Sequence, residues 1–106
     1  MTFKEWLKYA TKNRSDDYIP LLPELKLNDG TELSVQASVF HMCNPKKTLY
    51  DGEYNAVEVY THGVQVYGLY GLYEASDWIY PNIDVDFMEH ICQLHGGINE
   101  QEVTAC

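Results

Sequence analysis

The chain has 106 residues, of which 45% are apolar, and its formal net charge is −9 at pH 7. This length fits a single domain with a real core, and the apolar content argues against a disordered chain despite the charge. No apolar run reaches the length of a transmembrane helix, and the first residues lack the apolar stretch of a signal peptide. We therefore expect a cytoplasmic protein with no membrane partner.

The charge is unevenly distributed along the chain. All seven lysines and arginines lie within residues 1–47, where six acidic residues leave a net charge of +1. Residues 48–106 contain ten aspartates and glutamates and no lysine or arginine. A field of this sign repels nucleic acids and anionic lipids and attracts basic protein surfaces, although a simple role in solubility fits the composition equally well.

The N-terminal residues predict a helix. Thr2 and Glu5 have the spacing of a capping box, and apolar side chains then recur at helical spacing over residues 3–12. A polar loop at 13–17 and an extended, proline-containing segment follow. Residues 25–27 predict a short strand, and the Asn-Asp-Gly that comes next predicts a turn.

Two longer strands are expected in the middle of the chain. Alternation of apolar and polar residues predicts a half-buried strand over residues 33–41. A proline ends this strand, and a loop is expected at 44–54. Residues 55–62 predict the next strand, with the side chains of Glu58 and Tyr60 pointing outward.

The last third of the chain predicts a strand and a helix. Residues 64–72 favour β-structure but contain two glycines, which predicts either a bulged strand or a mobile loop. Residues 78–80 predict a short strand that ends at Pro81. Asn82 or Asp84 is then expected to cap a helix, which a Gly-Gly pair ends. The predicted apolar face of this helix is Ile83, Phe87, Ile91 and Leu94.

The order of these elements predicts an α+β fold. An antiparallel sheet of three to five strands carries an N-terminal and a C-terminal helix packed on one face. Residues 1–98 form the predicted domain, and residues 99–106 form a polar C-terminal tail in which Cys106 has no expected role.

The cysteines and histidines are the candidates for metal or nucleophilic chemistry. An odd number of cysteines indicates free thiols in a reducing compartment. Cys43, Cys92 and His95 could supply three zinc ligands, although their spacing matches no known ligand pattern. In the simpler interpretation, Cys92 packs as a small apolar residue and His95 suits the negative end of the helix dipole. Cys43 is the only candidate nucleophile and lacks a surrounding motif, so we expect no catalytic residue, no metal and no cofactor.

The region without lysine or arginine is also rich in tyrosine. Tyrosines can anchor a partner at low entropic cost while carboxylates select for its arginines and lysines, although cross-strand packing explains part of the pattern. The predicted partner-binding residues are Glu53, Glu58, Tyr60, Tyr67, Tyr70, Tyr73, Glu74, Asp77, Asp84, Asp86 and Glu89. Among them, Asp84 and Asp86 are better explained by capping and the helix dipole at the start of the helix.

Several short motifs carry a resemblance to a group of known proteins. They are Leu27-Asn28-Asp29-Gly30, Ser34-Val35-Gln36-Ala37-Ser38, His41-Met42-Cys43-Asn44-Pro45, Val57-Glu58-Val59 and His95-Gly96-Gly97-Ile98. Over residues 3–98, the chain resembles small proteins carried by phages and integrated elements of bacteria, largely Gram-positive ones. The resemblance implies no catalytic residues. It does imply a genomic setting in which small acidic proteins often inhibit host defence nucleases.

Charge, tyrosines and resemblance together predict a non-enzymatic inhibitor similar to anti-CRISPR proteins. It is expected to bind a basic, nucleic-acid-binding surface of a host CRISPR effector or another defence nuclease, without binding nucleic acid itself. Two alternatives remain open. One is a small-ligand or metal-binding domain that uses the histidines and cysteines, and the other is a structural or assembly protein of a mobile element. A homodimer is compatible with the chain.

Overall fold

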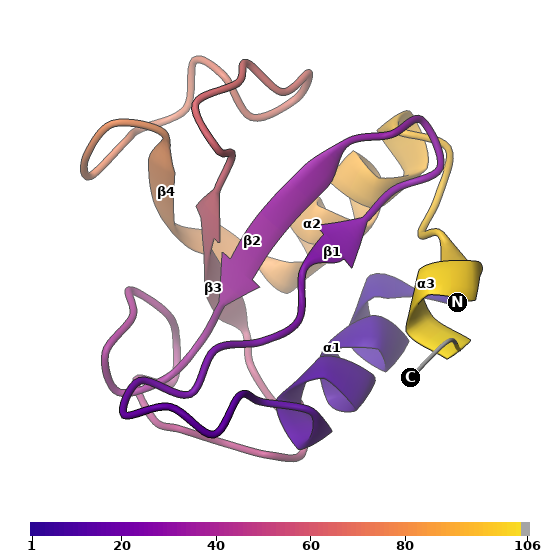
Figure 1. The fold of residues 1–106 in the computed structure, drawn as a ribbon. Coiled ribbons are helices and arrows are strands. Elements are labelled where there is room, and N and C mark those ends of the chain that lie inside the picture. Colours follow the sequence, from indigo (N-terminus) through magenta and orange to yellow (C-terminus); the bar gives the residue numbers. More distant parts are fainter. Residues whose placement is uncertain (105–106) are drawn as a thin grey trace.

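The computed structural model describes residues 1–104 and confirms the α+β fold (Figure 1). The elements are α1 (Phe3–Lys12), β1 (Leu25–Lys26), β2 (Glu32–Gln36), β3 (Ala56–Tyr60), β4 (Ile79–Asp84), α2 (Val85–Leu94) and α3 (Glu100–Thr104). The strands form one antiparallel sheet in the order β1-β2-β3-β4. Within residues 1–104, no helix combines the length and the apolar composition that crossing a bilayer requires.

Helix α1 spans the predicted residues because its capping box forms. The hydroxyl of Thr2 accepts a hydrogen bond from the Glu5 N–H at 3.1 Å, and the Glu5 carboxylate accepts one from the Thr2 N–H at 2.7 Å. These bonds lower the pKa of Glu5. On the buried face, the ring of Trp6 stacks on that of Phe3 at 5.7 Å and is completely enclosed. The N-terminal helix is therefore fixed both by its cap and by its apolar face.

The sheet and both long helices enclose one hydrophobic core. Alternate side chains of the two central strands are fully buried in it, as the period of a half-buried strand requires: Leu33 and Val35 of β2, and Val57 and Val59 of β3. Helix α2 contributes Val85, Met88, Ile91 and Cys92. Since these residues share one core with the buried side chains of α1, both helices cover the same face of the sheet. The opposite face carries Glu58 and Tyr60, as predicted.

The strand predicted over residues 33–41 ends early, at Gln36. The cause is the side chain of Ser38, whose hydroxyl accepts a hydrogen bond from the N–H of Phe40 at 3.0 Å and lies 2.6 Å from Nδ1 of His41. A serine that bonds the backbone two residues on offers the chain a turn in place of a sheet ladder. Val39 and Phe40 consequently lie exposed in this turn rather than continuing the alternation.

Strand β4 is longer than predicted and runs through Pro81. It lies at the edge of the sheet, where a residue without an N–H group is tolerated. The register with β3 also shifts at this point, because Val57 faces Ile83 whereas Val59 faces Tyr80. Two residues of β4 therefore oppose one residue of β3, which is the geometry of a β-bulge.

Helix α2 begins at Val85, two residues later than its predicted apolar face. Asp84 is the N-cap, and its carboxylate accepts a hydrogen bond from the Asp86 N–H at 2.8 Å. The buried face of the helix is Val85, Met88, Ile91 and Cys92, which shares only Ile91 with the predicted face. Ile83 is buried but belongs to β4, while Leu94 is exposed at the surface.

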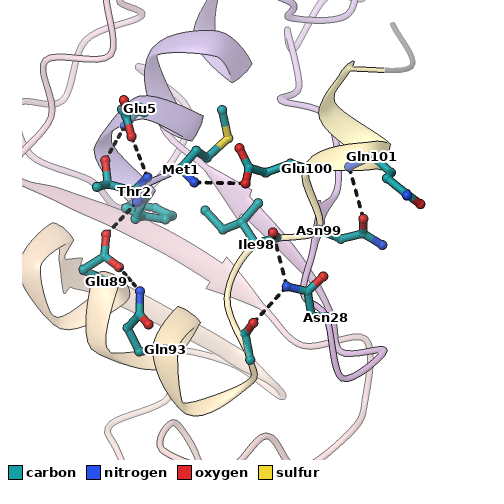
Figure 2. A network of polar contacts seen from close by, with 12 residues as sticks. Met1, Thr2, Glu5, Asn28, Glu89, Gln93, Ile98, Asn99, Glu100 and Gln101 are labelled. Atoms are coloured by element: carbon teal, nitrogen blue, oxygen red, sulfur yellow. Dashed lines mark hydrogen bonds and ion pairs between the residues drawn. The ribbon is translucent and has the colours of Figure 1, made fainter.

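The chain after α2 returns to β1, where Ile98 lies at the end of the predicted domain. Ile98 is buried and forms a bridge with Leu27, and the ammonium group of Met1 lies 3.3 Å from the carboxylate of Glu100 (Figure 2). Residues 100–104 form α3 instead of a polar extension. Cys106 lies outside the described residues.

Candidate functional site

The eleven predicted partner-binding residues do not form a single surface. Tyr67, Tyr70, Tyr73, Glu74 and Asp77 lie in the loop between β3 and β4, residues 61–78, which we call the tyrosine loop. Glu53, Asp84 and Asp86 lie together at the N-terminal end of α2. Glu58 and Tyr60 lie on β3, and Glu89 lies within α2. The tyrosine loop stands apart from the body of the sheet in Figure 1.

Glu89 holds the two long helices together. One carboxylate oxygen accepts a hydrogen bond from the N–H of Phe3 at 2.7 Å, and the other accepts one from the side-chain amide of Gln93 at 2.8 Å (Figure 2). Phe3 is the first residue of α1, where backbone N–H groups lack helical partners and the helix dipole favours an anion. We therefore assign Glu89 to helix packing and not to partner binding.

Most of the other predicted acids also have local partners. The carboxylates of Glu58, Asp84 and Glu74 accept hydrogen bonds, at 2.8–3.1 Å, from the N–H groups of Met42, Asp86 and Trp78 respectively. Asp86 lies 3.5 Å from the ammonium group of Lys4 in an exposed pair. Within residues 1–104, the carboxylates of Glu53 and Asp77 take part in no hydrogen bond or ion pair. Replacing either of these two acids therefore changes the charge of the surface without breaking an interaction.

The N-terminal end of α2 gathers acids together with two lysines of α1. Glu53, Asp84 and Asp86 line a hollow of about 330 Å³. Lys4 and Lys8 of α1 line the same hollow. Glu5 of α1 lines it as well, so four carboxylates share this small space with two ammonium groups, and the lysines offset half of its negative charge.

The tyrosine loop is a series of turns held down by two apolar side chains. Val66 and Leu69 are buried in the core, whereas Tyr67, Tyr70 and Tyr73 are 63%, 53% and 78% exposed. Of the two predicted alternatives, the bulged strand does not form, and a loop takes its place. The buried side chains of Val66 and Leu69 hold the loop against the core, and the three tyrosine rings point into solvent.

Both the middle and the end of the tyrosine loop are fixed by close backbone contacts. Gly68 has a φ of 96°, and a Cβ atom at this position would lie 2.5 Å from Cδ1 of Ile91 on α2. At the end of the loop, Trp78 has a φ of 65° and is half-buried. Its N–H donates to Glu74 at 2.8 Å, and its carbonyl oxygen accepts from the N–H of Thr61 at 3.1 Å. Trp78 thus closes the loop at its base.

A shallow groove of about 580 Å³ separates the tyrosine loop from the outer side of α2. It is lined by Tyr67, Gly68, Tyr70, Phe87, His90 and Leu94. No lysine or arginine lines it. Asp86, His90 and Leu94 are exposed and lie four residues apart, so they form a row along one side of α2. His90 and Leu94 of this row line the groove, and the carboxylate of Asp86 lies at the N-terminal end of the row. We call this the tyrosine groove.

His95 connects the tyrosine loop to the turn between β1 and β2. The buried ring has Nδ1 2.6 Å from a carboxylate oxygen of Asp29 and Nε2 2.9 Å from the carbonyl oxygen of Tyr67. Both contacts are within hydrogen-bonding distance, so the ring bridges the turn after β1 and the tyrosine loop. His95 therefore links the tyrosine loop to the turn between β1 and β2. Its position at the end of the helix did not predict this role.

We expect Asp29→Asn to destabilise the protein only above acidic pH. Burial raises the pKa of Asp29, but hydrogen bonds from Thr31 and His95 outweigh it and lower that pKa below its ordinary value of 3.8. A carboxyl group with a lowered pKa contributes stability that is present above the ordinary pKa and lost as the pH falls through the folded value. Chemical denaturation should show a loss of about 1 kcal/mol near pH 6, which disappears as the pH falls below the ordinary pKa of 3.8 and through the lower pKa of the folded state.

The matched control for Asp29→Asn is Asp77→Asn, which removes an exposed carboxylate without a partner among residues 1–104. Its free energy of unfolding should follow the wild-type value across the same pH range. A loss for Asp29→Asn that is equal at both pH values would contradict the role given to the Asp29 charge.

The cysteines and histidines are dispersed. Within residues 1–104, no three histidine, cysteine, aspartate or glutamate side chains are placed to hold a metal ion, so Cys43, Cys92 and His95 do not form the zinc site considered from the sequence. Burial raises the pKa of Cys92 to about 12. Burial also raises the pKa of Cys43, which disfavours the thiolate that nucleophilic chemistry needs.

These features define the class of protein: a small α+β domain whose most distinctive surface is an aromatic groove between a loop and a helix. Comparisons with protein-family models, with curated proteins and with solved structures find no match to the chain. The function is therefore argued from the site itself.

Proposed function

We propose that this protein is a non-enzymatic binding protein whose tyrosine groove docks onto a basic surface of a partner protein. The observation that carries the proposal is that Tyr67, Tyr70 and Tyr73 are held exposed beside a groove in a region without lysine or arginine. Tyrosine rings offer a large contact area with little loss of side-chain entropy. Arginine and lysine can stack on them, with about 0.5–2 kcal/mol for each cation–π contact.

The charge of the chain supports a basic partner. From residue 48 onward the formal charge is −10 with histidine neutral, and both walls of the tyrosine groove come from this part of the chain. Such a field accelerates encounter with a basic surface and disfavours nucleic acid as the direct ligand. Within the groove, stacking on the rings would then fix the position of the partner.

In its specific form, the proposal is an anti-CRISPR-like inhibitor. Basic, nucleic-acid-binding surfaces of a host CRISPR effector or another defence nuclease carry the arginines and lysines that this groove suits. Occupying such a surface would keep the nuclease from its nucleic acid.

The general proposal can be tested with a fluorescently labelled deca-arginine peptide. Its anisotropy should report binding at about 50 mM salt and a loss of affinity of at least about tenfold at about 500 mM. The pair Tyr67→Ala and Tyr70→Ala should also weaken binding about tenfold, because both rings line the groove. Thermal unfolding should change little, since the rings are exposed.

Two matched variants locate the contact. Tyr60→Ala removes a tyrosine on the opposite face of the sheet and should leave peptide affinity unchanged. Asp77→Lys and Glu53→Lys change the net charge equally, but only Asp77 lies in the tyrosine loop, so Asp77→Lys should weaken binding more. Binding that ignores salt, or equal losses in all these variants, would refute the proposed site. For the specific form, the protein should block DNA cleavage by a CRISPR effector and the tyrosine pair should not.

A further inference from the structure

A second exposed apolar surface lies where the segment before β1 meets the loop after β2. It consists of Tyr18, Ile19, Leu21, Val39, Phe40 and Tyr50, which we call the loop platform. Tyr18 is 89% exposed, and its ring lies 5.7 Å from the ring of Phe40. The contact between Tyr18 and Phe40 joins the two segments, and the N–H of Val39 donates to the hydroxyl of Thr48 at 3.2 Å within the loop after β2. Contiguous apolar surface of this kind marks an interaction site more often than chance exposure.

Arg14 fixes the loop platform from beneath. Its guanidinium group donates to the carbonyl oxygen of Leu49 at 2.7 Å and to that of Pro20 at 3.2 Å. The same group lies 5.3 Å from the centre of the Tyr50 ring. One arginine thus binds both segments that form the platform. The two segments are therefore held in a fixed arrangement relative to each other.

Charges of both signs flank the loop platform. Asp16 and Asp17 directly precede Tyr18, while Lys46 and Lys47 lie in the loop after β2. All four side chains are exposed, and none takes part in an ion pair within residues 1–104. A wholly basic or wholly acidic partner would meet like charge on one flank. A second copy turned by a two-fold axis instead brings each aspartate pair toward the lysine pair of the other copy.

We propose that two copies of this chain associate through the loop platform as a two-fold dimer. The six large apolar side chains of the platform, three of them aromatic, are 39–89% exposed, and this exposed area contributes to the roughly 800 Å² per partner that a stable interface buries. Asp16 and Asp17 of each copy face Lys46 and Lys47 of the other. This contact goes beyond the proposed function and uses a different surface. It leaves both tyrosine grooves free, so the dimer presents two of them to a partner.

Charge exchange gives the sharpest test, with mass in solution measured by multi-angle light scattering. The wild-type chain should be dimeric at about 100 µM. The variant Asp16→Lys, Asp17→Lys carries four positive flanking charges and should be monomeric. The variant Lys46→Asp, Lys47→Asp carries four negative ones and should also be monomeric. An equal mixture of the two variants should form dimers again, because opposite charges face each other at both contacts.

Two further variants separate this contact from the tyrosine groove. Phe40→Asp should abolish the dimer while leaving the circular dichroism spectrum and the binding of deca-arginine peptide unchanged. The pair Tyr67→Ala and Tyr70→Ala should bind the peptide about tenfold more weakly and remain dimeric. A monomeric wild-type chain, or two charge variants that stay dimeric alone or monomeric when mixed, would overturn the proposed dimer without touching the proposed function.

Discussion

Replacing Gly52 with alanine should lower the free energy of unfolding by about 3 kcal/mol, among the largest losses expected of a single methyl group. Gly52 has a φ of 76°, a region that L-residues with a side chain rarely adopt. Its added Cβ atom would also lie 2.7 Å from Cα and 2.9 Å from the backbone nitrogen of Lys8. Backbone atoms of α1 cannot rotate away as a flexible side chain can. Urea denaturation of both proteins would measure the loss.

Gly30→Ala separates the two causes. Gly30 also has a positive φ, of 93°, but no heavy atom outside its own chain neighbours lies within 4 Å of the added Cβ atom. We therefore expect this variant to cost about 1 kcal/mol, the cost of the backbone conformation alone. Equal losses for Gly52→Ala and Gly30→Ala would mean that the loop before β3 does not press on α1.

Leu69→Ala should destabilise the domain by about 3 kcal/mol and weaken peptide binding as well. The side chain is fully buried, and it lies between two of the exposed tyrosines of the tyrosine loop. Removing it leaves a cavity beneath the loop and frees the rings to adopt conformations that do not bind. Denaturation and deca-arginine anisotropy on the same sample would measure both effects.

Leu72→Ala is the matched control in the same loop. Leu72 is exposed, so this variant loses the same atoms without creating a buried cavity. Its stability should change by less than about 0.5 kcal/mol. If Leu69→Ala destabilised the domain but bound the peptide with unchanged affinity, the groove would not depend on the position of the loop.

The fold was predictable where local signals act alone. The capping box of Thr2 and Glu5 sets the start of α1, and alternation identifies the buried side of β3. The predicted ends of strands were wrong where a single side chain overrides the alternation of apolar and polar residues. Ser38 ends β2 by bonding to the backbone, which alternation alone cannot reveal. Pro81 was expected to end a strand, yet an edge position and a bulge accommodate it.

The candidate site was predictable only in part. The sequence pointed to the tyrosines of the loop, but it missed the helical wall of the groove, including Phe87 and Leu94. Helical spacing placed Phe87 and Leu94 on the face expected to pack in the core, and spacing alone cannot reveal that both residues line a groove. The role of Glu89 could not be seen, because its partner Phe3 is 86 positions away in the chain.

The two tryptophans occupy contrasting places in the domain. Trp6 is sealed in the core against Phe3, whereas Trp78 is half-buried at the base of the tyrosine loop. Indole fluorescence depends on the surroundings of each ring, so the two residues report on different events. In a Trp6→Phe variant the remaining emission follows the loop, and in a Trp78→Phe variant it follows the collapse of the core. The chain therefore carries built-in optical probes that distinguish local opening of the binding loop from global unfolding.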